Sequence, residues 1–330
     1  MSKTYLITGG TGFIGAALVR RLVQAGARVR VLDNNLRGRP RRIADIADDI
    51  EMIEADVRDG DAVRKAASGV DCVLHLAYVN GTEYFYEHPE LILDIAVRGM
   101  LNVLDACRAE KVPELVLASS SEAYHQPPIV PTPEGVPLVV PDPLNPRYSY
   151  GGGKLISELM ALNWGRKGFE RVMIFRPHNV YGPDMGWEHV IPDLGRKIWR
   201  AHIDQPSGAL TIPLQGDGKQ TRAFVFIEDF ADGVMTMLDR GQHLNIYHIG
   251  RDEEVSIEHL ARALAGYFGR EAEFQHGDAP KGATTRRCPD VSKLAALGYA
   301  PKVDLAAGLK TTMDWYVAHF PERELDRMAV

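Results

Sequence analysis

The stretch TGGTGFIG at residues 8–15 decides the fold, because it joins a short apolar run to a stretch with helical periodicity at residues 13–25. Its glycines let the backbone turn tightly and approach a pyrophosphate at the N-terminus of the helix that follows. Such a turn is typical of proteins that bind a dinucleotide. The residues expected to form it are Gly9, Thr11, Gly12, Phe13, Ile14 and Gly15.

The first half of the chain alternates short apolar or β-branched runs with helical stretches, and this rhythm predicts βαβ units and a parallel sheet. The runs lie at residues 5–8, 29–32, 51–54, 72–76 and 115–118. We expect an α/β protein with a Rossmann-type, doubly wound parallel sheet and a smaller C-terminal substrate-binding lobe. The expected division assigns residues 1–178, with a return segment at about 224–250, to the sheet domain, and residues 179–223 and 251–330 to the lobe.

Asp33 closes the second expected strand. An acid at this point hydrogen-bonds the adenosine ribose hydroxyls and repels a 2′-phosphate, which favours NAD over NADP. Arg37 and Arg39 lie close enough in the sequence to weaken that preference. After the third strand, Asp56 and Val57 offer a carboxylate and a backbone amide to the adenine edge, although an isolated aspartate there is more often a helix cap or turn residue.

Ser120, Tyr150 and Lys154 form the candidate catalytic group. Tyr150 and Lys154 lie one helical turn apart in an expected helix at residues 150–164, so the ammonium can lie near the phenol and favour its ionised form. A free tyrosine titrates near ~10 and would otherwise be a poor base at neutral pH. Ser120, at the end of the fifth strand, would hydrogen-bond the same substrate hydroxyl. A YxxxK pattern alone is common in long helices, and its occurrence together with the glycine turn is what favours catalysis.

Seven motifs spread over nearly the whole chain carry a family resemblance. They are TGGTGFIG (8–15), HLAY (75–78), SSSEAY (119–124), YSYGGGK (148–154), RPHNVYGP (176–183), GDGKQTRAFVFIED (216–229) and RRCPDVSK (286–293). With these motifs the chain resembles the extended short-chain dehydrogenase/reductase family, the nucleotide-sugar epimerases and dehydratases. The resemblance implies catalytic roles for Ser120, Tyr150 and Lys154, and an NAD that stays bound through the cycle.

The resemblance also implies further contacts to the cofactor and the substrate. It implies that Asn179, Arg222 and Arg287 hold the diphosphate of a nucleotide-activated sugar, with Val190 beside them, and two guanidiniums and an amide suit phosphate oxygens. Taken alone, each arginine would more often form a surface salt bridge, and Asn179 could equally cap a turn. The other residues expected at the cofactor are Asn34, Leu76, Ala77, Tyr78, Ser119, Tyr150, Lys154, Pro177, Asn179 and Val180.

The chain departs from the family pattern at several positions. Ala96 stands where such enzymes usually have an Asn, so one hydrogen bond on the nicotinamide side is missing, and Ala223 replaces an Asp beside Arg222. The run at residues 151–153 puts three glycines inside the expected helix, at a cost of roughly 0.8 to 1 kcal/mol each relative to Ala. We expect either a close approach of the sugar or nicotinamide to this backbone or, equally, a frayed helix start.

Ser121 and Glu122 bear on the reaction. In the family, dehydratases usually carry Asp-Glu after the catalytic hydroxyl residue, decarboxylases Ser-Glu, and many epimerases neither acid. Glu122 is then either a base near C5 of the sugar or a carboxylate paired with an arginine such as Arg147. Because epimerisation asks least of the site, the first expectation is an NAD-dependent nucleotide-sugar epimerase acting through transient C4 oxidation to a ketosugar. The alternatives are 4,6-dehydration or decarboxylation with Glu122, a net reductase that releases its cofactor, and a non-catalytic dinucleotide-binding regulator.

Composition and charge narrow the possible partners. The net charge of −6 comes from mixed acidic and basic residues without a basic stripe, so we expect no nucleic-acid partner. The cysteines Cys72, Cys107 and Cys288 lie far apart without a CxxC pair, so neither a metal site nor a disulfide is expected. The N-terminal apolar run is too short for a signal peptide or a membrane span, and we expect a cytoplasmic protein with no membrane partner.

Two segments are expected to carry specificity and one pair of helices to carry assembly. Residues 126–147 hold eight prolines and predict a long ordered loop, which together with residues 185–199 is expected to select the base and the sugar. The segment at residues 91–110 predicts a helix with a wide apolar face. By resemblance, this helix and the Tyr150 helix are the pair through which relatives form homodimers.

Overall fold

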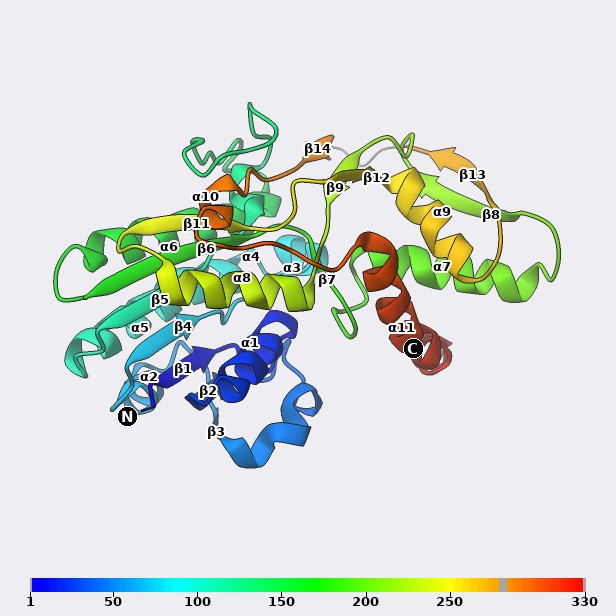
Figure 1. Cartoon of the computed structure of the whole chain (residues 1–330). Helices are drawn as coiled ribbons and strands as arrows, with labels where there is room; N and C mark the ends of the chain where they lie inside the picture. Colours follow the sequence, from blue (N-terminus) through cyan, green and yellow to red (C-terminus); the bar gives the residue numbers. More distant parts are fainter. Residues whose placement is uncertain (1, 279–283, 329–330) are drawn as a thin grey trace.

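The computed structural model describes residues 2–278 and 284–328. Its centre is a seven-stranded sheet in the order β11-β6-β5-β4-β1-β2-β3 (Figure 1). All neighbouring strands in this sheet are parallel. The strands are β1 (Thr4–Thr8), β2 (Arg28–Asp33), β3 (Ile50–Glu54), β4 (Cys72–His75), β5 (Glu114–Ala118), β6 (Arg171–Pro177) and β11 (Asn245–Ile249). The predicted α/β fold with a doubly wound parallel sheet is therefore confirmed.

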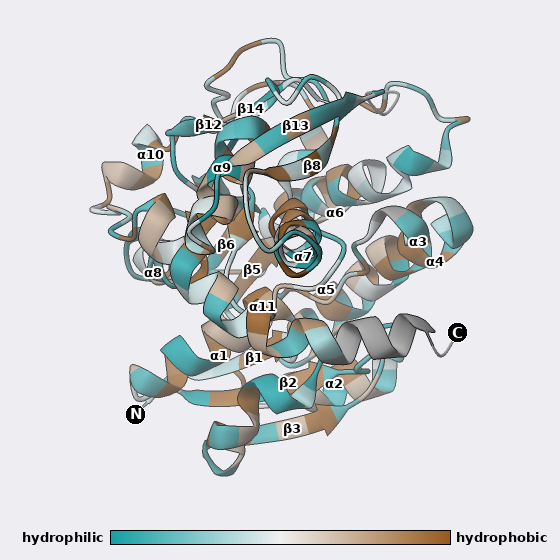
Figure 2. Ribbon diagram, turned by 90° about the vertical axis from the view of Figure 1, so that its right-hand side faces the viewer, coloured by the Kyte–Doolittle hydropathy of each residue, from teal (hydrophilic) through white to brown (hydrophobic). Residues whose placement is uncertain are grey.

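The inner strands of the sheet are buried on both faces because they are apolar at successive positions, whereas the edge strand β3 is half-buried to exposed (Figure 2). Alternate side chains of a strand point to opposite faces, so Ile7 of β1 joins one apolar cluster while Leu6 joins the other. The first cluster includes side chains of α1 (Phe13–Gln24) and α8 (Ile227–Arg240). The second includes side chains of α2 (Gly60–Ala67), α4 (Pro89–Asp94), α5 (Met100–Ala109) and α6 (Ser149–Gly165).

The helix predicted at residues 91–110 is present, with an irregularity in its middle. Between α4 and α5 the chain makes a π-helical turn, η2 (Ile95–Gly99). Ala96 in this turn is buried against α6, where the Ser157 hydroxyl donates to its carbonyl oxygen at 3.1 Å. Such turns are frequent at functional sites, and Ile95 lines the pocket described below.

A further set of elements forms a smaller lobe beside the carboxyl ends of the strands, at the right of Figure 1. Its helices are α7 (Val190–Asp204), α9 (Ile257–Tyr267) and α11 (Leu305–Met328), and its parallel pair is β8 (Leu210–Gln215) with β13 (Ala272–Gly277). A second small sheet consists of β12 (Glu254–Ser256), β9 (Thr221–Ala223) and β14 (Arg286–Arg287), and a third of β10 (Val225–Phe226) and β7 (Val180–Tyr181).

Two segments return to the sheet domain after entering the lobe. Residues 227–249 return as α8 and β11, at the edge of the sheet beside β6. The short helix α10 (Ser292–Ala295) packs against β11 and α8, so the range 251–330 expected for the lobe includes a helix that contacts the sheet domain.

The proline-rich segment 126–147 forms the predicted loop, with one short turn of 3-10 helix, η4 (Pro146–Tyr148), at its end. Backbone hydrogen bonds of Thr132 fix this loop to residues 288–290. The Thr132 amide donates to the carbonyl oxygen of Cys288, and the Thr132 carbonyl oxygen accepts from the amide of Asp290, both at 2.8 Å. Within residues 2–278 and 284–328, no helix combines the length and apolarity that crossing a membrane would require.

Candidate active site

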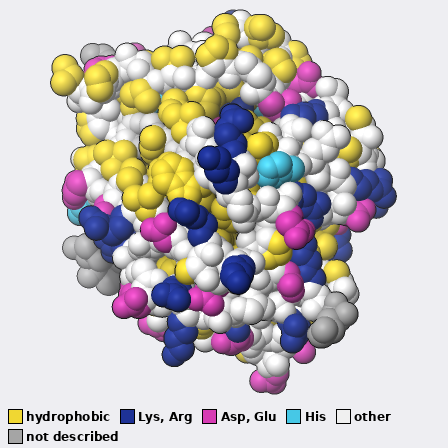
Figure 3. Space-filling model, turned by 90° about the vertical axis from the view of Figure 1, so that its left-hand side faces the viewer, with side chains coloured by type: hydrophobic (Ala, Val, Ile, Leu, Met, Phe, Trp, Pro, Cys, Tyr) yellow, Lys and Arg dark blue, Asp and Glu magenta, His cyan; other side chains and the backbone are white. Residues whose placement is uncertain are grey.

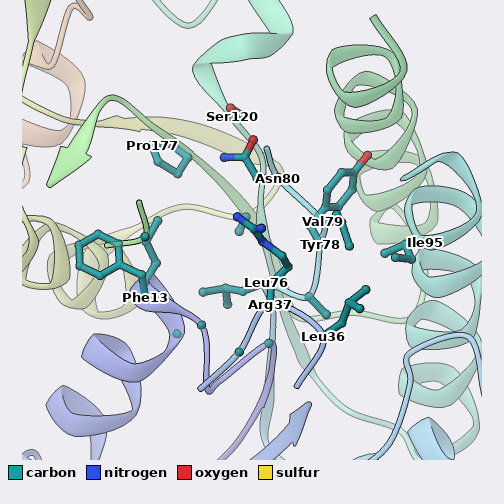
Figure 4. Close-up of a pocket in the computed structure, with 18 of the residues that line it drawn as sticks. Phe13, Leu36, Arg37, Leu76, Tyr78, Val79, Asn80, Ile95, Ser120 and Pro177 are labelled. Atoms are coloured by element: carbon teal, nitrogen blue, oxygen red, sulfur yellow. The ribbon is translucent and has the colours of Figure 1, made fainter. Parts of the chain in front are cut away.

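A pocket lies at the carboxyl ends of strands β1 to β6, beside the point where the strand order reverses between β1 and β4. Figure 4 shows Phe13 at the start of α1, Arg37 after β2 and Ser120 after β5 around this pocket. The lining residues that were predicted from the sequence are Gly9, Gly12, Phe13, Ile14, Gly15, Asp33, Asn34, Asp56, Val57, Leu76, Ala77, Tyr78, Ser119, Ser120, Ser121, Glu122, Tyr150, Lys154, Pro177, Asn179, Val180 and Arg287.

Three predicted site residues lie outside this lining. Thr11 is buried beneath it, where its amide donates to the Asp33 carboxylate at 2.9 Å. Val190 begins α7. Arg222 donates to two backbone carbonyl oxygens, those of Thr221 at 2.7 Å and Thr284 at 2.9 Å.

The glycine turn has the geometry that a dinucleotide needs. A side chain at Gly15 would overlap the carbonyl oxygen of Gly9, and one at Gly9, where φ is +77°, would lie 2.7 Å from the amide of Ala77. α1 therefore starts directly behind the turn. Its N-cap, Gly12, provides no side-chain hydrogen bond, and its first turn has no acidic residue. The first amides of α1 and the helix dipole suit the pyrophosphate of NAD.

The acid at the end of β2 is held in place by the backbone around it. Asp33 is 7% exposed, and its two carboxylate oxygens accept from the amides of Thr11 and Asn35, each at 2.9 Å. A side chain at Gly38 would overlap the Thr11 hydroxyl, so the loop after β2 packs closely over the glycine turn. This placement suits recognition of the adenosine ribose.

Residues 36–42 contribute to the pocket more than the sequence indicated. Arg37 lines the pocket and lies over the Tyr84 ring at 5.2 Å, whereas the Arg39 guanidinium donates to the carbonyl of Gly38. Sequence proximity alone could not separate these two arginines. Arg37 also lies 3.6 Å from the carboxylate of Glu188.

A second set of ion pairs joins this loop to the segment before α7. Arg41 and Arg42 each lie 3.0 Å from the Asp184 carboxylate, and Arg42 also donates to the Asp184 carbonyl at 2.7 Å. Arg42 lines the pocket, as do Met185 and Gly186 on the opposite segment. The loop after β2 and residues 184–188 therefore meet at one end of the pocket.

Tyr150, Ser120 and Lys154 come together in the pocket at the end of β5. Lys154 donates to the carbonyl oxygen of Ala118 at 2.8 Å, and its ammonium lies 3.7 Å from the centre of the Tyr78 ring. The ammonium is 5.8 Å from the centre of the Tyr150 ring. The ammonium thus lies near both tyrosine rings, and Tyr78 is the nearer of the two; the expected proximity to the Tyr150 phenol stays a prediction.

The protonation states of the pair follow from burial. Burial raises the pKa of Tyr150 to about 12, although a hydrogen bond with Ser120 acts to lower it. The ring is stacked on Phe85 at 5.1 Å and meets Tyr78 edge-on at 5.2 Å. Burial lowers the pKa of Lys154 to about 7, against the charge of Glu158, which raises it. In the protein alone, Tyr150 is neutral at pH 7 and Lys154 is only partly charged.

Glu122 forms an ion pair with Arg287, not with Arg147 as suggested from the sequence. Burial acts to raise the pKa of Glu122, but the charge and hydrogen bond of Arg287 outweigh it and hold the pKa below its ordinary value. Arg147 adds a further positive charge nearby. Glu122 is therefore an ionised carboxylate at neutral pH and cannot donate a proton as a general acid.

Arg222 and Asn179 are placed around the same end of the site. Burial lowers the pKa of Arg222 to about 10, and the positive charge of Arg287 acts in the same direction. Asn179 has φ of +41°, and its amide donates to the carbonyl of Ala223 at 3.0 Å. Two guanidiniums that share one counter-charge, Glu122, provide an environment that favours an added anion.

The glycine run has neighbours within the protein. A side chain at Gly151 would lie 2.7 Å from the His125 ring, and one at Gly153 would overlap the Tyr78 hydroxyl. One at Gly152 would lie 3.3 Å from Val140 of the proline-rich loop. α6 begins at Ser149, before the run, so the frayed-start explanation was wrong. Close packing of His125, Tyr78 and the loop accounts for the small residues without a ligand.

Comparisons with known proteins agree with this geometry. The family model for the NAD dependent epimerase/dehydratase family matches residues 5–250. A dTDP-4-dehydro-6-deoxy-D-allose reductase of Streptomyces bikiniensis is 31% identical over 96% of this chain and 97% of its own. A UDP-N-acetyl-alpha-D-glucosaminuronate decarboxylase of Bacillus cytotoxicus is 28% identical over 96% and 98%, respectively.

A solved structure extends the likeness to three dimensions. The UDP-glucose 4-epimerase of Thermus thermophilus, solved in complex with NAD, matches with a TM-score of 0.79 at 26% identity, covering 95% of this chain and 99% of its own. The family model matches most of the chain. The pocket agrees with this match, because it brings together the glycine turn, the Asp33 carboxylate and the candidate catalytic residues Ser120, Tyr150 and Lys154. The chain belongs to the NAD dependent epimerase/dehydratase family of enzymes.

Proposed function

We propose that this enzyme is an NAD-dependent nucleotide-sugar epimerase that transiently oxidises the sugar at C4. The observation that carries the proposal is the meeting of Ser120, Tyr150 and Lys154 in the pocket that begins at the glycine turn. The carboxylate beside them, Glu122, is held ionised by Arg287, and position 121 is a serine. The site thus offers proton transfer at one hydroxyl and lacks the general acid that the resemblance associates with dehydration.

In the proposed reaction, Tyr150 takes the proton of the C4 hydroxyl and later returns it, while Ser120 hydrogen-bonds the same oxygen. Bound NAD supplies the acceptor and donor of the hydride and, in its oxidised form, a positive charge. Because burial holds the pKa of Tyr150 at about 12, the phenol becomes a base only when positive charge is added to the site. Protonated Lys154, fixed by the carbonyl of Ala118, contributes to that charge.

We further propose that Arg222, Arg287 and Asn179 hold the diphosphate of the substrate. The two arginines share Glu122 as a counter-ion, which leaves positive charge for a second anion. Rotation of the ketosugar about the diphosphate linkage, followed by return of the hydride to the other face, would invert C4. This step needs room and no additional acid or base.

The test is a panel of nucleotide sugars incubated with the purified protein, with the products read by NMR and mass spectrometry. An inverted C4 centre at unchanged mass is expected. Tyr150→Phe should lower kcat by about 10²–10⁴-fold, the range for general acid–base catalysis. Tyr148→Phe, a neighbouring tyrosine whose ring meets His125 at 4.7 Å, serves as the control and should retain activity. Equal turnover by Tyr150→Phe and the unaltered enzyme would refute the proposal.

Decarboxylation is the second candidate, because the Ser121–Glu122 sequence is the one that the resemblance associates with decarboxylases. A uronic-acid nucleotide sugar in the panel distinguishes the two. A product lighter by the mass of carbon dioxide, formed by the unaltered enzyme and lost in Glu122→Gln, would replace the epimerase proposal by this one.

We also propose that two copies associate through α4, η2 and α6, as relatives do by resemblance. Leu93, Val97, Ile156 and Leu159 on these elements are between 36% and 49% exposed. Figure 3 shows a different face, the left-hand side of Figure 1, where hydrophobic side chains gather in the upper half and charged side chains are more frequent below. Light scattering should give twice the chain mass of 36.5 kDa, and Leu159→Glu should reduce it to the single-chain value. A single-chain mass for the unaltered protein would refute the dimer.

A further inference from the structure

Tyr78 contacts the Lys154 ammonium, but the proposed reaction gives Tyr78 no role. The Lys154 ammonium lies on the face of the Tyr78 ring, 3.7 Å from its centre, and the Tyr78 ring meets the Tyr150 ring edge-on. A cation at this distance from an aromatic face is attracted by the negative charge of the ring's π-system. Within the described residues, Lys154 donates a hydrogen bond to the carbonyl oxygen of Ala118, and the Tyr78 ring supplies a second contact.

The Tyr78 hydroxyl faces a small residue, Gly153, which has a second small residue, Ala96, beside it. A side chain at Gly153 would overlap the Tyr78 hydroxyl and would lie 2.9 Å from the Ala96 Cβ. Gly153 is in α6, and Ala96 is in the π-helical turn η2. Figure 4 shows the Tyr78 phenol directed toward the helices at the right of the view. The two departures noted in the sequence, an Ala at position 96 and a Gly at position 153, thus lie next to each other, and Gly153 faces the Tyr78 hydroxyl.

The Tyr78 hydroxyl does not stabilise the described residues through a hydrogen bond. It is buried and has no hydrogen-bond partner among residues 2–278 and 284–328. An unpaired buried hydroxyl costs free energy, so the protein retains this residue at a cost. The ring face, not the hydroxyl, makes the contact with the charged group of the active site.

We propose that Tyr78 is a positioning residue that holds the Lys154 ammonium, and that Gly153 and Ala96 are the small residues that admit its ring. The role rests on the proposed function, in which Lys154 contributes positive charge next to the base. The ring keeps the ammonium at the end of β5 and favours its charged form, against the desolvation that opposes it. Tyr78 acts on the reaction through Lys154.

The first experiment measures the packing by thermal melting and needs no substrate. Gly153→Ala should lower Tm strongly, because the added methyl overlaps the Tyr78 hydroxyl. In the Tyr78→Phe background that overlap is removed, and the same substitution should cost less than half as many degrees. Gly152→Ala, whose methyl would face Val140 at 3.3 Å, is the matched control and should cost the same in both backgrounds. Equal Tm losses for Gly153→Ala in the two backgrounds would overturn the packing part of the proposal.

The second experiment measures the titration of Lys154 in the purified protein labelled with ¹³C-lysine. The Lys154 signal is assigned by its loss in Lys154→Met. Tyr78→Leu keeps apolar volume but removes the π-system, so the midpoint should fall by about one pH unit. Tyr78→Phe keeps the ring and should restore the original midpoint. An unchanged or raised midpoint in Tyr78→Leu would overturn the positioning role, and Tyr86→Leu, a half-exposed tyrosine of α3 (Thr82–Glu87), is the control.

The two experiments separate this role from the proposed function. If no nucleotide sugar is turned over, the melting and titration data still decide whether Tyr78 holds Lys154. If turnover is found, the alkaline limb of the pH profile adds a third readout. Lys154 loses its charge as the pH rises through its pKa, so Tyr78→Leu should lose activity at a lower pH than the unaltered enzyme, and Tyr78→Phe should not show this shift. A coincident alkaline limb for Tyr78→Leu would contradict the role in catalysis.

Discussion

Replacing Glu158 by Gln should destabilise the protein strongly, because the change leaves the Arg176 guanidinium without its counter-charge in the core. Glu158 in α6 and Arg176 in β6 form two hydrogen bonds, at 2.8 and 2.6 Å, and their side chains are 4% and 3% exposed. Ser119, in the lining of the pocket, donates to the same carboxylate, and Arg176 also donates to the Tyr124 hydroxyl. The pair therefore joins the end of the active site to the core.

Removal of one partner from a buried ion pair costs about 3–5 kcal/mol, a large part of the roughly 5–15 kcal/mol that stabilises a typical domain. For a chain of this size, the loss corresponds to a Tm decrease of roughly 4–7 °C. The charge of Glu158 also raises the pKa of Lys154. Without it, Lys154 should lose its proton at a lower pH, in addition to the loss of stability.

The assay is urea unfolding at pH 7 with thermal melting as a second measure. Asp94→Asn is the control, because its pair with Arg98 is 32% and 64% exposed and should contribute less than about 1 kcal/mol. Replacing both core partners, as Glu158→Leu with Arg176→Met, should recover much of the loss, since no unpaired charge remains. A free energy of unfolding for Glu158→Gln within the range of the Asp94→Asn control would refute this reasoning.

Three further predictions concern the glycine turn, an acidic residue and the thiols. Gly15→Ala should abolish NAD retention, measured in the supernatant after denaturation, because the methyl overlaps the Gly9 carbonyl; Gly266→Ala, with open space around it in α9, should instead gain about 0.5–1 kcal/mol. A hydrogen bond from Arg58 lowers the pKa of Asp56 to about 2. The stability that the ionised Asp56 carboxylate contributes is therefore present above pH ~4 and is lost as the pH falls toward 2. The difference in urea stability between the unaltered protein and Asp56→Asn should therefore narrow over that range, and a constant difference would contradict it. All three cysteines are buried and burial raises the pKa of each thiol, so alkylation at pH 8 should be slow in the folded protein and fast in urea; rapid labelling of the folded protein would disprove this.

Local sequence patterns predicted the features that depend on neighbouring residues. The apolar or β-branched runs predicted β1 to β5; β1, β4 and β5 are apolar at most successive positions because they are buried on both faces, whereas the edge strand β3 alternates with glutamates. The order of the motifs along alternating strands and helices then predicts that their residues gather at the carboxyl ends of a parallel sheet. Most of the predicted residues do line the pocket there.

Local sequence patterns could not predict contacts between segments that are distant in the sequence. Arg147 is the closer arginine to Glu122 in sequence, yet Arg287 is its partner, brought there by β14 of the lobe. The glycine run could not be explained from the helix alone, because Tyr78 and His125, which pack on it, come from the ends of other strands. The π-helical turn at residues 95–99 leaves the apolar periodicity nearly unchanged, so only the backbone reveals it.

The ion pairs between residues 37–42 and residues 184–188 have a kinetic consequence. They connect two segments that both line one end of the pocket, and they include Arg42, which is largely buried. We expect the exchange of a dinucleotide with bulk solution to need a local opening of these segments, so that its residence time follows the opening rate. An enzyme that returns the electrons to the molecule that gave them has no need of such exchange, and slow release then protects the ketone stage from being stranded without a reductant.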